Sequence, residues 1–410
     1  MENSISSRGL TLEARKPVFF DVLNNLWDPE SNPDGIVNIG LAENADQALM
    51  QAEMKSFINA QPGAESHALT YGDGFTGSKK LKAAMCHFLN RHFQPHTPLH
   101  PNAIENCAWV LCDPGDYVLV GRPYWTTFRS ILGNRAGVNI LEVTMGPVDP
   151  MGLDAVARFE EVAEQARREG KRVKGILLCS PNNPLGRCFP EDVLKGYMQL
   201  CQKLGMHLIS DELYGLSVWN NPESTDPTPF TSVLSINTDG LVDPQLVHAV
   251  WGLSKDFGAT GLRIGVLISQ SNPVFLGACE SISLFSFPSS LADKAVASLL
   301  SNDAITDSFI ATNRTRLAES YQFVTKFCQA NGIPYTHSNA ALFVWINLGA
   351  IVKDPEMTDD VLLSRLRLEG VYMTSGATYA CEEPGWFRVV MAHPRRVLEE
   401  GLKRMMRALR

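Results

Sequence analysis

The sequence lacks the features that place a chain in a membrane, on nucleic acid or in the secretory pathway. No apolar run approaches the roughly 20 residues that a membrane helix needs. The first residues carry no apolar segment of the kind found in a signal peptide. The net charge is −8 and no block of basic residues is present, which argues against a nucleic-acid or anionic-membrane surface. We therefore expect a soluble, cytoplasmic protein without nucleic-acid or membrane partners.

Cysteine and histidine are present, but not at the spacings of a disulfide framework or a metal site. The nine cysteines are scattered and include no Cys-x-x-Cys pair, which favours reduced thiols. Five histidines cluster in sequence without a His-Glu-x-x-His frame, at positions 67, 87, 92, 96 and 100. Solvated imidazoles are the expectation for such a cluster, and we predict no metal site.

Composition and hydrophobic periodicity predict a globular α/β protein. The chain has 410 residues, of which 45% are apolar, a length typical of two or three domains. Helical spacing occurs in 78–93, 153–168 and 193–204, and short strands are expected at 117–120, 175–179, 207–209, 246–250 and 265–268. Alternating strands and helices indicate a mostly parallel sheet flanked by helices. From about residue 290 the pattern becomes that of a smaller α+β region, with helices at 292–300, 305–331 and 359–368 and strands at 342–346 and 386–391.

Polar residues follow three successive strands of the expected sheet. The sequence Ser-Pro-Asn-Asn-Pro-Leu-Gly at 180–186 follows the first, Asp211 to Tyr214 the second, and Gly252 to Lys255 the third, with Arg263 a little further on. Ligands of open parallel sheets bind at the carboxyl ends of the strands. These loops therefore bring an amide, a carboxylate, a phenol, an amine and a guanidinium towards one ligand site.

This set of groups suits an aromatic aldehyde that carries a pyridine ring and a phosphate. Such a cofactor needs an amine for a Schiff base, which Lys255 offers, and a carboxylate to keep the ring nitrogen protonated, which Asp211 offers. Asn183 and Tyr214 can hydrogen-bond the phenolic oxygen, and Arg263 can bind the phosphate. Each residue alone is a weak signal, because a loop lysine is usually solvated and a strand-end aspartate usually caps a helix.

The motifs in their order resemble those of the fold-type I, pyridoxal-phosphate-dependent aminotransferases of class I/II. Within them the chain is most similar to the 1-aminocyclopropane-1-carboxylate synthase-like branch, which includes fungal secondary-metabolism members. The resemblance runs from about Asn38 to Arg388. It rests on NIGLAEN (38–44), YGDGFTG (71–77), DPGD (113–116), RPYW (122–125), SPNNPLG (180–186), SDELYG (210–215), GLSKDFGATGLRIG (252–265) and FRVVMAH (387–393).

The resemblance implies a role for each matching residue. Lys255 would form the Schiff base and move the Cα proton, and Asp211 would pair with the pyridinium nitrogen. The remaining cofactor contacts would come from Asn183, Tyr214, Ser254, Arg263, Trp125, which would stack on the ring, and Tyr71, which would reach in from a partner subunit. Arg388 would bind the substrate α-carboxylate together with Asn183, and Glu43 would lie near the substrate.

Three departures from the family pattern affect the phosphate site. Gly252 stands where the family usually has a serine, and the synthase-like register puts Phe75 at the position of the phosphate-binding tyrosine, although Tyr71 is near enough to serve. The third departure is larger. Compared with the family pattern, about a dozen residues are missing before the helix expected at 103–109. Their loss would remove a strand and the anion-binding start of a helix. We therefore hypothesise weakened cofactor affinity.

Three rival interpretations were weighed. Residues 72–77 spell Gly-x-Gly-x-x-Gly, but the strands that a dinucleotide site needs on both sides are not apparent. Residues 252–256 differ from a serine-hydrolase nucleophile elbow by Asp256 in place of glycine. A homologue that has lost catalysis also stays open, because of the apparent deletion.

The resulting prediction is a two-domain enzyme of aminotransferase fold type I. Residues 1–45 would form an arm that joins the small domain, 46–289 the large cofactor-binding domain, and 290–410 the small domain. The resemblance implies a homodimer, and an amino acid with a keto acid as substrates. Transamination is the first prediction. β- or γ-elimination is the second, as in a carbon–sulfur lyase or a 1-aminocyclopropane-1-carboxylate synthase-like enzyme.

Overall fold

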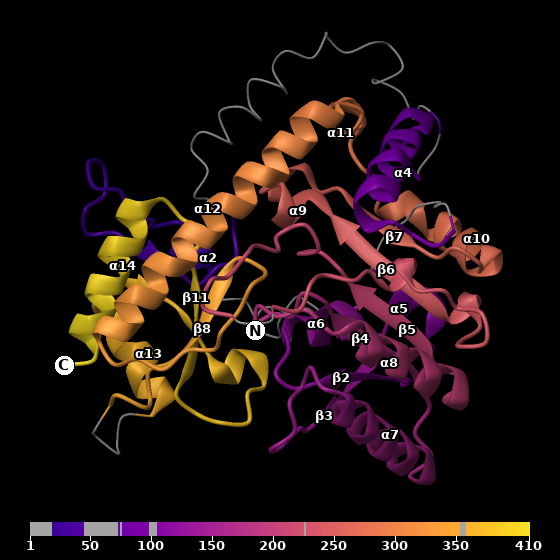
Figure 1. Ribbon diagram of the computed structural model, residues 1–410, viewed down its shortest axis with the longest axis horizontal. Coiled ribbons are helices and arrows are strands. Elements are labelled where there is room, and N and C mark those ends of the chain that lie inside the picture. The colour runs from indigo at the N-terminus through magenta and orange to yellow at the C-terminus, as the bar shows by residue number, and fades with distance from the viewer. Residues whose placement is uncertain (1–18, 45–72, 74–75, 98–104, 225–226, 353–357) are drawn as a thin grey trace, which may run out of the picture.

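A six-stranded sheet forms the centre of the larger part of the molecule in the computed structural model, which describes residues 19–44, 73, 76–97, 105–224, 227–352 and 358–410 (Figure 1). Its strand order is β3-β2-β4-β5-β6-β7, parallel except for β7, which pairs antiparallel with β6. The strands are β2 (Tyr117–Gly121), β3 (Asn139–Val143), β4 (Val173–Cys179), β5 (His207–Asp211), β6 (Val247–Gly252) and β7 (Gly265–Ile268). The expected parallel sheet is confirmed.

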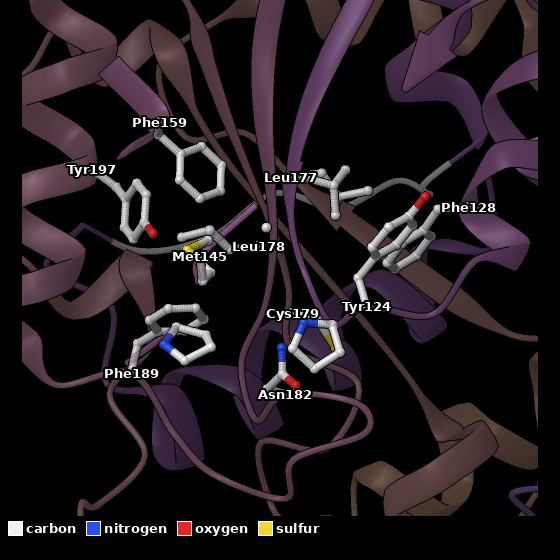
Figure 2. A pocket seen from close by; sticks show the side chains of 14 residues that line it. Tyr124, Phe128, Met145, Phe159, Leu177, Leu178, Cys179, Asn182, Phe189 and Tyr197 are labelled. Atoms are coloured by element: carbon white, nitrogen blue, oxygen red, sulfur yellow. The ribbon is translucent and has the colours of Figure 1, made fainter. Parts of the chain in front are cut away.

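Helices cover both faces of this sheet because its strands are apolar on both sides. Successive side chains of a strand point to opposite faces. Leu178 accordingly lies towards Phe159 and Tyr197, whereas Leu177 lies towards Tyr124 and Phe128, around a small cavity of about 20 Å³ (Figure 2). One face packs against α4 (Lys79–Phe93), α7 (Leu153–Arg168), α8 (Glu191–Leu204) and α11 (Ser290–Leu300), and the other against α5 (Glu105–Leu111), α6 (Thr127–Gly133) and α10 (Pro273–Ile282).

A smaller antiparallel sheet lies in the other part of the molecule (Figure 1). Its order is β10-β11-β8, formed by β10 (Thr374–Ser375), β11 (Trp386–Val390) and β8 (Phe343–Asn347). The helices α13 (Asp359–Leu368) and α14 (Arg395–Ala408) pack with it in a separate core. The strand β1 (Val37–Asn38) pairs in parallel with β9 (Val371–Tyr372). That residues 1–45 as a whole join the small domain stays a prediction.

The long helix α12 (Asp303–Ala330) connects the two parts (Figure 1). Near its start Phe309 and Ile310 lie in the core of the large sheet, and further on Leu317 and Tyr321 lie in the core of the small sheet. The helix α11, just before it, also packs in the core of the large sheet. The division of the chain after residue 289 stays a prediction.

The region of the apparent deletion lies between α4 and α5. Of this region the structure describes residues 94–97, which form no strand, whereas 98–104 lie outside the described residues. Within the described chain, β7 pairs with β6 alone and lies at the edge of the sheet. The hypothesis of a lost strand therefore stays a prediction.

Short elements complete the fold. They are the helices α2 (Phe19–Leu23) and α9 (Leu253–Asp256) and the 3₁₀ turns η2 (Val233–Ser235), η3 (Pro244–Leu246), η4 (Thr260–Leu262), η5 (Ser283–Phe285) and η6 (Gly376–Tyr379). No helix in the described ranges is both long and apolar enough to cross a bilayer.

Candidate active site

The three polar loops meet because β4, β5 and β6 are adjacent and parallel. Cys179 at the end of β4 pairs with Asp211 at the end of β5, and Asp211 pairs with Val250 of β6. The loops continue these contacts, since the Ser180 N–H donates to the Asp211 carbonyl at 2.9 Å. The sheet thus places the three polar loops side by side, as the sequence predicted.

Lys255 lies on α9, a four-residue helix that begins directly after β6. Its Nζ donates a hydrogen bond of 2.7 Å to the Ala42 carbonyl, so the segment before residue 45 contacts the loop after β6. Burial, followed by the positive charges of Arg388 and Arg263, lowers the pKa of the amine to about 8, although the negative charges of Glu43 and Asp211 act to raise it. A buried lysine with these neighbours is neutral in a substantial fraction of molecules near pH 8.

Asp211 is the last residue of β5 and is 3% exposed. Burial raises the pKa of its carboxyl to about 7, although the Leu213 N–H, 3.2 Å from Oδ1, and the charge of Lys255 both act to lower it. A buried carboxylate that accepts so little hydrogen bonding is stabilised by a cation that comes into contact with it. The arrangement therefore favours a positively charged ligand group at this point.

Arg388 reaches the same place from β11 of the small sheet. Its guanidinium donates from Nη1 to Asn183 Oδ1 at 2.8 Å and from Nη2 to the Gly40 carbonyl at 2.6 Å. The rings of Phe343 and Tyr379 lie 4.8 and 4.9 Å from its Cζ. Its buried Nε has no hydrogen-bond partner among the described residues. An unpaired buried guanidinium N–H is costly, and an anionic ligand would satisfy it.

Tyr214 and Asn183 complete the buried part of the site. Tyr214 packs edge-to-face on Phe343 with ring centroids 5.6 Å apart. Burial raises the pKa of its phenol well above the usual value, whereas the charge of Arg388 acts to lower it. The hydroxyl is thus a neutral group that can donate a hydrogen bond to a ligand.

The three residues expected at the phosphate and ring positions lie further out. Arg263 is exposed, has a φ of 53° and donates from Nη1 to the Thr260 carbonyl at 3.1 Å. It lines a cavity of about 520 Å³ with Phe287, Ser289 and other residues, and its charge lowers the pKa of Lys255. Ser254 is half-buried on α9. Trp125 is half-buried in the loop after β2, edge-to-face on Phe128 at 5.4 Å.

The structure thus groups most of the predicted site residues, but not all. The charges of Arg388, Glu43, Asp211 and Arg263 all act on Lys255. The described contacts of Trp125 do not connect it to this group. Tyr71 lies outside the described residues.

Several residues of the site were not found from the sequence. The carbonyls of Gly40 and Ala42 accept from Arg388 and Lys255, and the ring of Tyr379 lies against Arg388. Gly40 and Ala42 belong to the motif at 38–44, but a backbone carbonyl has no residue-type signature, so the motif did not indicate that these carbonyls accept hydrogen bonds. Tyr379 belongs to η6, whose position depends on the tertiary fold.

Comparison with known proteins identifies the family. The family model described as aminotransferase class I and II matches residues 37–405. The chain belongs to this family. It is 31% identical to a probable aminotransferase, aclI, of Aspergillus oryzae over 84% of each chain. It is 30% identical to 1-aminocyclopropane-1-carboxylate synthase of Glycine max, over 90% of this chain and 79% of the other.

A solved structure supports the same fold. Aspartate aminotransferase of Thermus thermophilus with maleate superposes with a TM-score of 0.74 at 22% identity, covering 99% of this chain and all of the other. Pyridoxal 5′-phosphate is the cofactor of the family, so the chain is a pyridoxal-phosphate-dependent transferase. Two features of the structure fit this group: the buried Asp211 carboxylate suits a protonated ring nitrogen, and the partly neutral Lys255 amine suits an aldehyde.

Proposed function

We propose that this chain is an aminotransferase that acts on an amino acid or an amino-acid-derived intermediate in secondary-metabolite biosynthesis. The observation that carries the proposal is the placement of a partly neutral Lys255 amine and a buried Asp211 carboxylate on neighbouring strand ends, with Arg388 beside them. The likeness to the probable aminotransferase of A. oryzae supports the reaction.

In this proposal the polar loops hold pyridoxal phosphate. Lys255 would bond its aldehyde carbon, Asp211 would pair with the ring nitrogen, and Asn183 and Tyr214 would hydrogen-bond the phenolic oxygen. Ser254 and Arg263 would bind the phosphate and Trp125 would stack on the ring, and Tyr71, which lies outside the described residues, would also serve the phosphate. When bound, the cofactor supplies an electron-accepting ring that stabilises negative charge at the substrate Cα.

The chain's own residues position the substrate and move its proton. Arg388, held by the Gly40 carbonyl and Asn183, would bind the α-carboxylate through its remaining N–H groups. Lys255 would take the Cα proton as a general base, a role for which a pKa of about 8 is suited at neutral pH. Asp211 would keep a positive charge on the ring nitrogen, because burial disfavours its own negative charge unless a cation comes into contact with it.

Elimination at the β- or γ-carbon is the second candidate. The observation in its favour is the electrostatic contact of Glu43 with Lys255, which places a second carboxyl group beside the proton-transfer residue. The relative from G. max, named as a 1-aminocyclopropane-1-carboxylate synthase, is in keeping with this chemistry. Both reactions begin with loss of the Cα proton, so the products distinguish them.

Two measurements test the proposal. Purified protein with pyridoxal phosphate should form an adduct that borohydride reduces onto Lys255, and Lys255→Ala should abolish both the adduct and turnover. A panel of amino and keto acids should yield amino-group exchange; release of ammonia or thiol instead would select elimination. Titration of the cofactor absorbance tests the hypothesis of weakened affinity, which full occupancy at sub-micromolar cofactor would refute.

We also propose a homodimer. Exposed apolar side chains surround the cavity that Arg263 lines, with Phe287 42% and Leu291 59% exposed. Such a surface is typical of a site that another chain covers. Light scattering during gel filtration should give about twice the 45.2 kDa mass of the chain, and a monomer at micromolar concentration would contradict this.

A further inference from the structure

A buried carboxylate follows the candidate catalytic lysine directly in the chain. Asp256 is 1% exposed and accepts three hydrogen bonds. Ser217 Oγ donates to its Oδ1 at 2.7 Å, and the Leu216 N–H and Trp251 Nε1 donate to its Oδ2 at 3.1 and 2.8 Å. A buried carboxylate with this many donors is held in one orientation.

The donors to Asp256 come from two segments that belong to the site. Trp251 lies on β6, immediately before the loop that carries Lys255. Leu216 and Ser217 lie in the turn that begins at Tyr214, whose carbonyl accepts from the Ser217 N–H at 2.9 Å. The side chain of Asp256 therefore fixes α9 relative to the segment that carries Tyr214.

Two asparagines fix the backbone of the same helix. Asn44 Nδ2 donates to the Lys255 carbonyl at 3.3 Å, and Asn313 Nδ2 donates to the Asp256 carbonyl at 3.4 Å. Asn44 also donates to Asn313 Oδ1 at 3.1 Å. Arg314 contributes from the same turn of α12, since its Nε donates to the Leu216 carbonyl at 2.8 Å and its charge acts on Asp256.

The helix α9 needs such external anchors because it is short. It has four residues, Leu253–Asp256, and a single helical turn is not stable by itself, since the first turn costs more entropy than its hydrogen bond returns. The amine of Lys255 lies at the end of a flexible side chain with large rotamer entropy. The position of the amine therefore depends on where α9 is held.

We infer that Asp256 is a positioning residue for Lys255. By fixing α9 to β6 and to the turn after Tyr214, Asp256 orients the Lys255 amine towards the cofactor aldehyde. The inference rests on the proposed function of Lys255. Asp256 itself touches neither cofactor nor substrate in this assignment. Its removal should slow the reaction of Lys255 with pyridoxal phosphate, because small displacements of a reacting group reduce rates strongly.

The experiment follows the capture of pyridoxal phosphate by the full-length apoprotein, with stopped-flow absorbance and borohydride trapping of the Lys255 adduct. Asp256→Ala removes the carboxylate and should slow capture by about tenfold or more. Asp256→Asn keeps the shape, since its oxygen can accept from Leu216 and Trp251 while its amide donates to Ser217, and should stay within about twofold of the unmodified protein.

A matched control separates positioning from general loss of stability. Asp116 is also 1% exposed, accepts from the Asp113 N–H and from Arg172, and lies just before β2 at the opposite end of the sheet. Asp116→Ala should lower the thermal midpoint without changing the capture rate constant of the folded protein. If Asp256→Ala does not fold, Ser217→Ala removes one of the three hydrogen bonds and should slow capture by about threefold.

Each outcome decides the inference. Slow capture in Asp256→Ala or Ser217→Ala, with Asp256→Asn and Asp116→Ala near the unmodified rate, supports it. Unchanged capture in Asp256→Ala, or in Ser217→Ala where Asp256→Ala does not fold, overturns it. The inference is also overturned if Asp256→Asn captures the cofactor as slowly as Asp256→Ala, because the asparagine keeps the hydrogen-bond geometry of the aspartate. An unmodified protein that forms no adduct at Lys255 shows instead that the proposed function is wrong, and the inference falls with it.

Discussion

The pKa of the Lys255 amine leads to a quantitative prediction about cofactor capture. Burial, with the charge of Arg388, lowers it from 10.5 to about 8. At pH 7.5 an amine with a pKa of 10.5 is about 0.1% neutral, whereas one with a pKa of 8 is about 24% neutral. Since only the neutral amine attacks an aldehyde, the environment increases the reactive fraction by about two hundred-fold.

The assay measures the initial rate of borohydride-stable adduct formation at Lys255 between pH 6 and 10.5. We expect the rate to rise with pH and to reach half of its maximum near pH 8. Arg388→Gln should move this midpoint upwards, because a cation that disfavours the ammonium form is lost. Glu43→Gln should move it downwards, because an anion that favours the ammonium form is lost.

Arg404 provides the control for these variants. Like Arg388 it is a buried guanidinium, 8% exposed, that donates to backbone carbonyls, including that of Gly35. It is not among the charges that shift the pKa of Lys255, so Arg404→Gln should leave the midpoint unchanged. A midpoint above pH 10 in the unmodified protein would refute the reasoning, as would shifts of the same sign in the Arg388 and Glu43 variants.

Three further predictions concern stability. Burial lowers the pKa of His248 from 6.5 to about 3, so the unfolded state binds a proton at a higher pH than the folded state does. The free energy of unfolding should therefore fall by about 1.4 kcal/mol for each pH unit below 6.5. His248→Gln should reduce this slope in urea denaturation between pH 4 and 7, and a slope equal to that of the unmodified protein would contradict the prediction. Phe387 lies on β11 and its side chain is fully buried. Phe387→Ala should therefore lower the free energy of unfolding by about 3–5 kcal/mol. A change below about 1 kcal/mol in the same titration would contradict tight packing of this side chain. Ser78→Ala removes the cap of α4 and a 2.6 Å hydrogen bond to Asp293 and should cost about 1–2 kcal/mol, whereas an unchanged thermal midpoint would argue against the cap.

The elements predicted best were those with a clear period and local end signals. The helix expected at 153–168 has these bounds in α7, and Ser78 caps α4 through the Leu81 N–H at 3.0 Å. The strand at 265–268 also has its expected bounds in β7. Apolar period and capping are properties of neighbouring residues, so they can be read without knowledge of the fold.

The elements that were missed depend on distant partners. The strand β1 consists of two residues and exists through its pairing with β9, more than 300 positions later in the chain. The strand β3 and the helices α6 and α10 were also not predicted; Asn139–Val143 is partly exposed and lies at an edge of the sheet. Weak apolar patterns of this kind give no local signal.

The sequence by itself determined the fold class and the chemical groups that follow β4, β5 and β6, because these depend on the local order of residue types. Only the tertiary structure decided what surrounds those groups. It brings Arg388 from the small sheet to Asn183, the Ala42 carbonyl to the Lys255 amine, and the turn after Tyr214 to Asp256. The burial that lowers the pKa of one group and raises that of another arises from packing between segments far apart in the chain, and no local pattern encodes it.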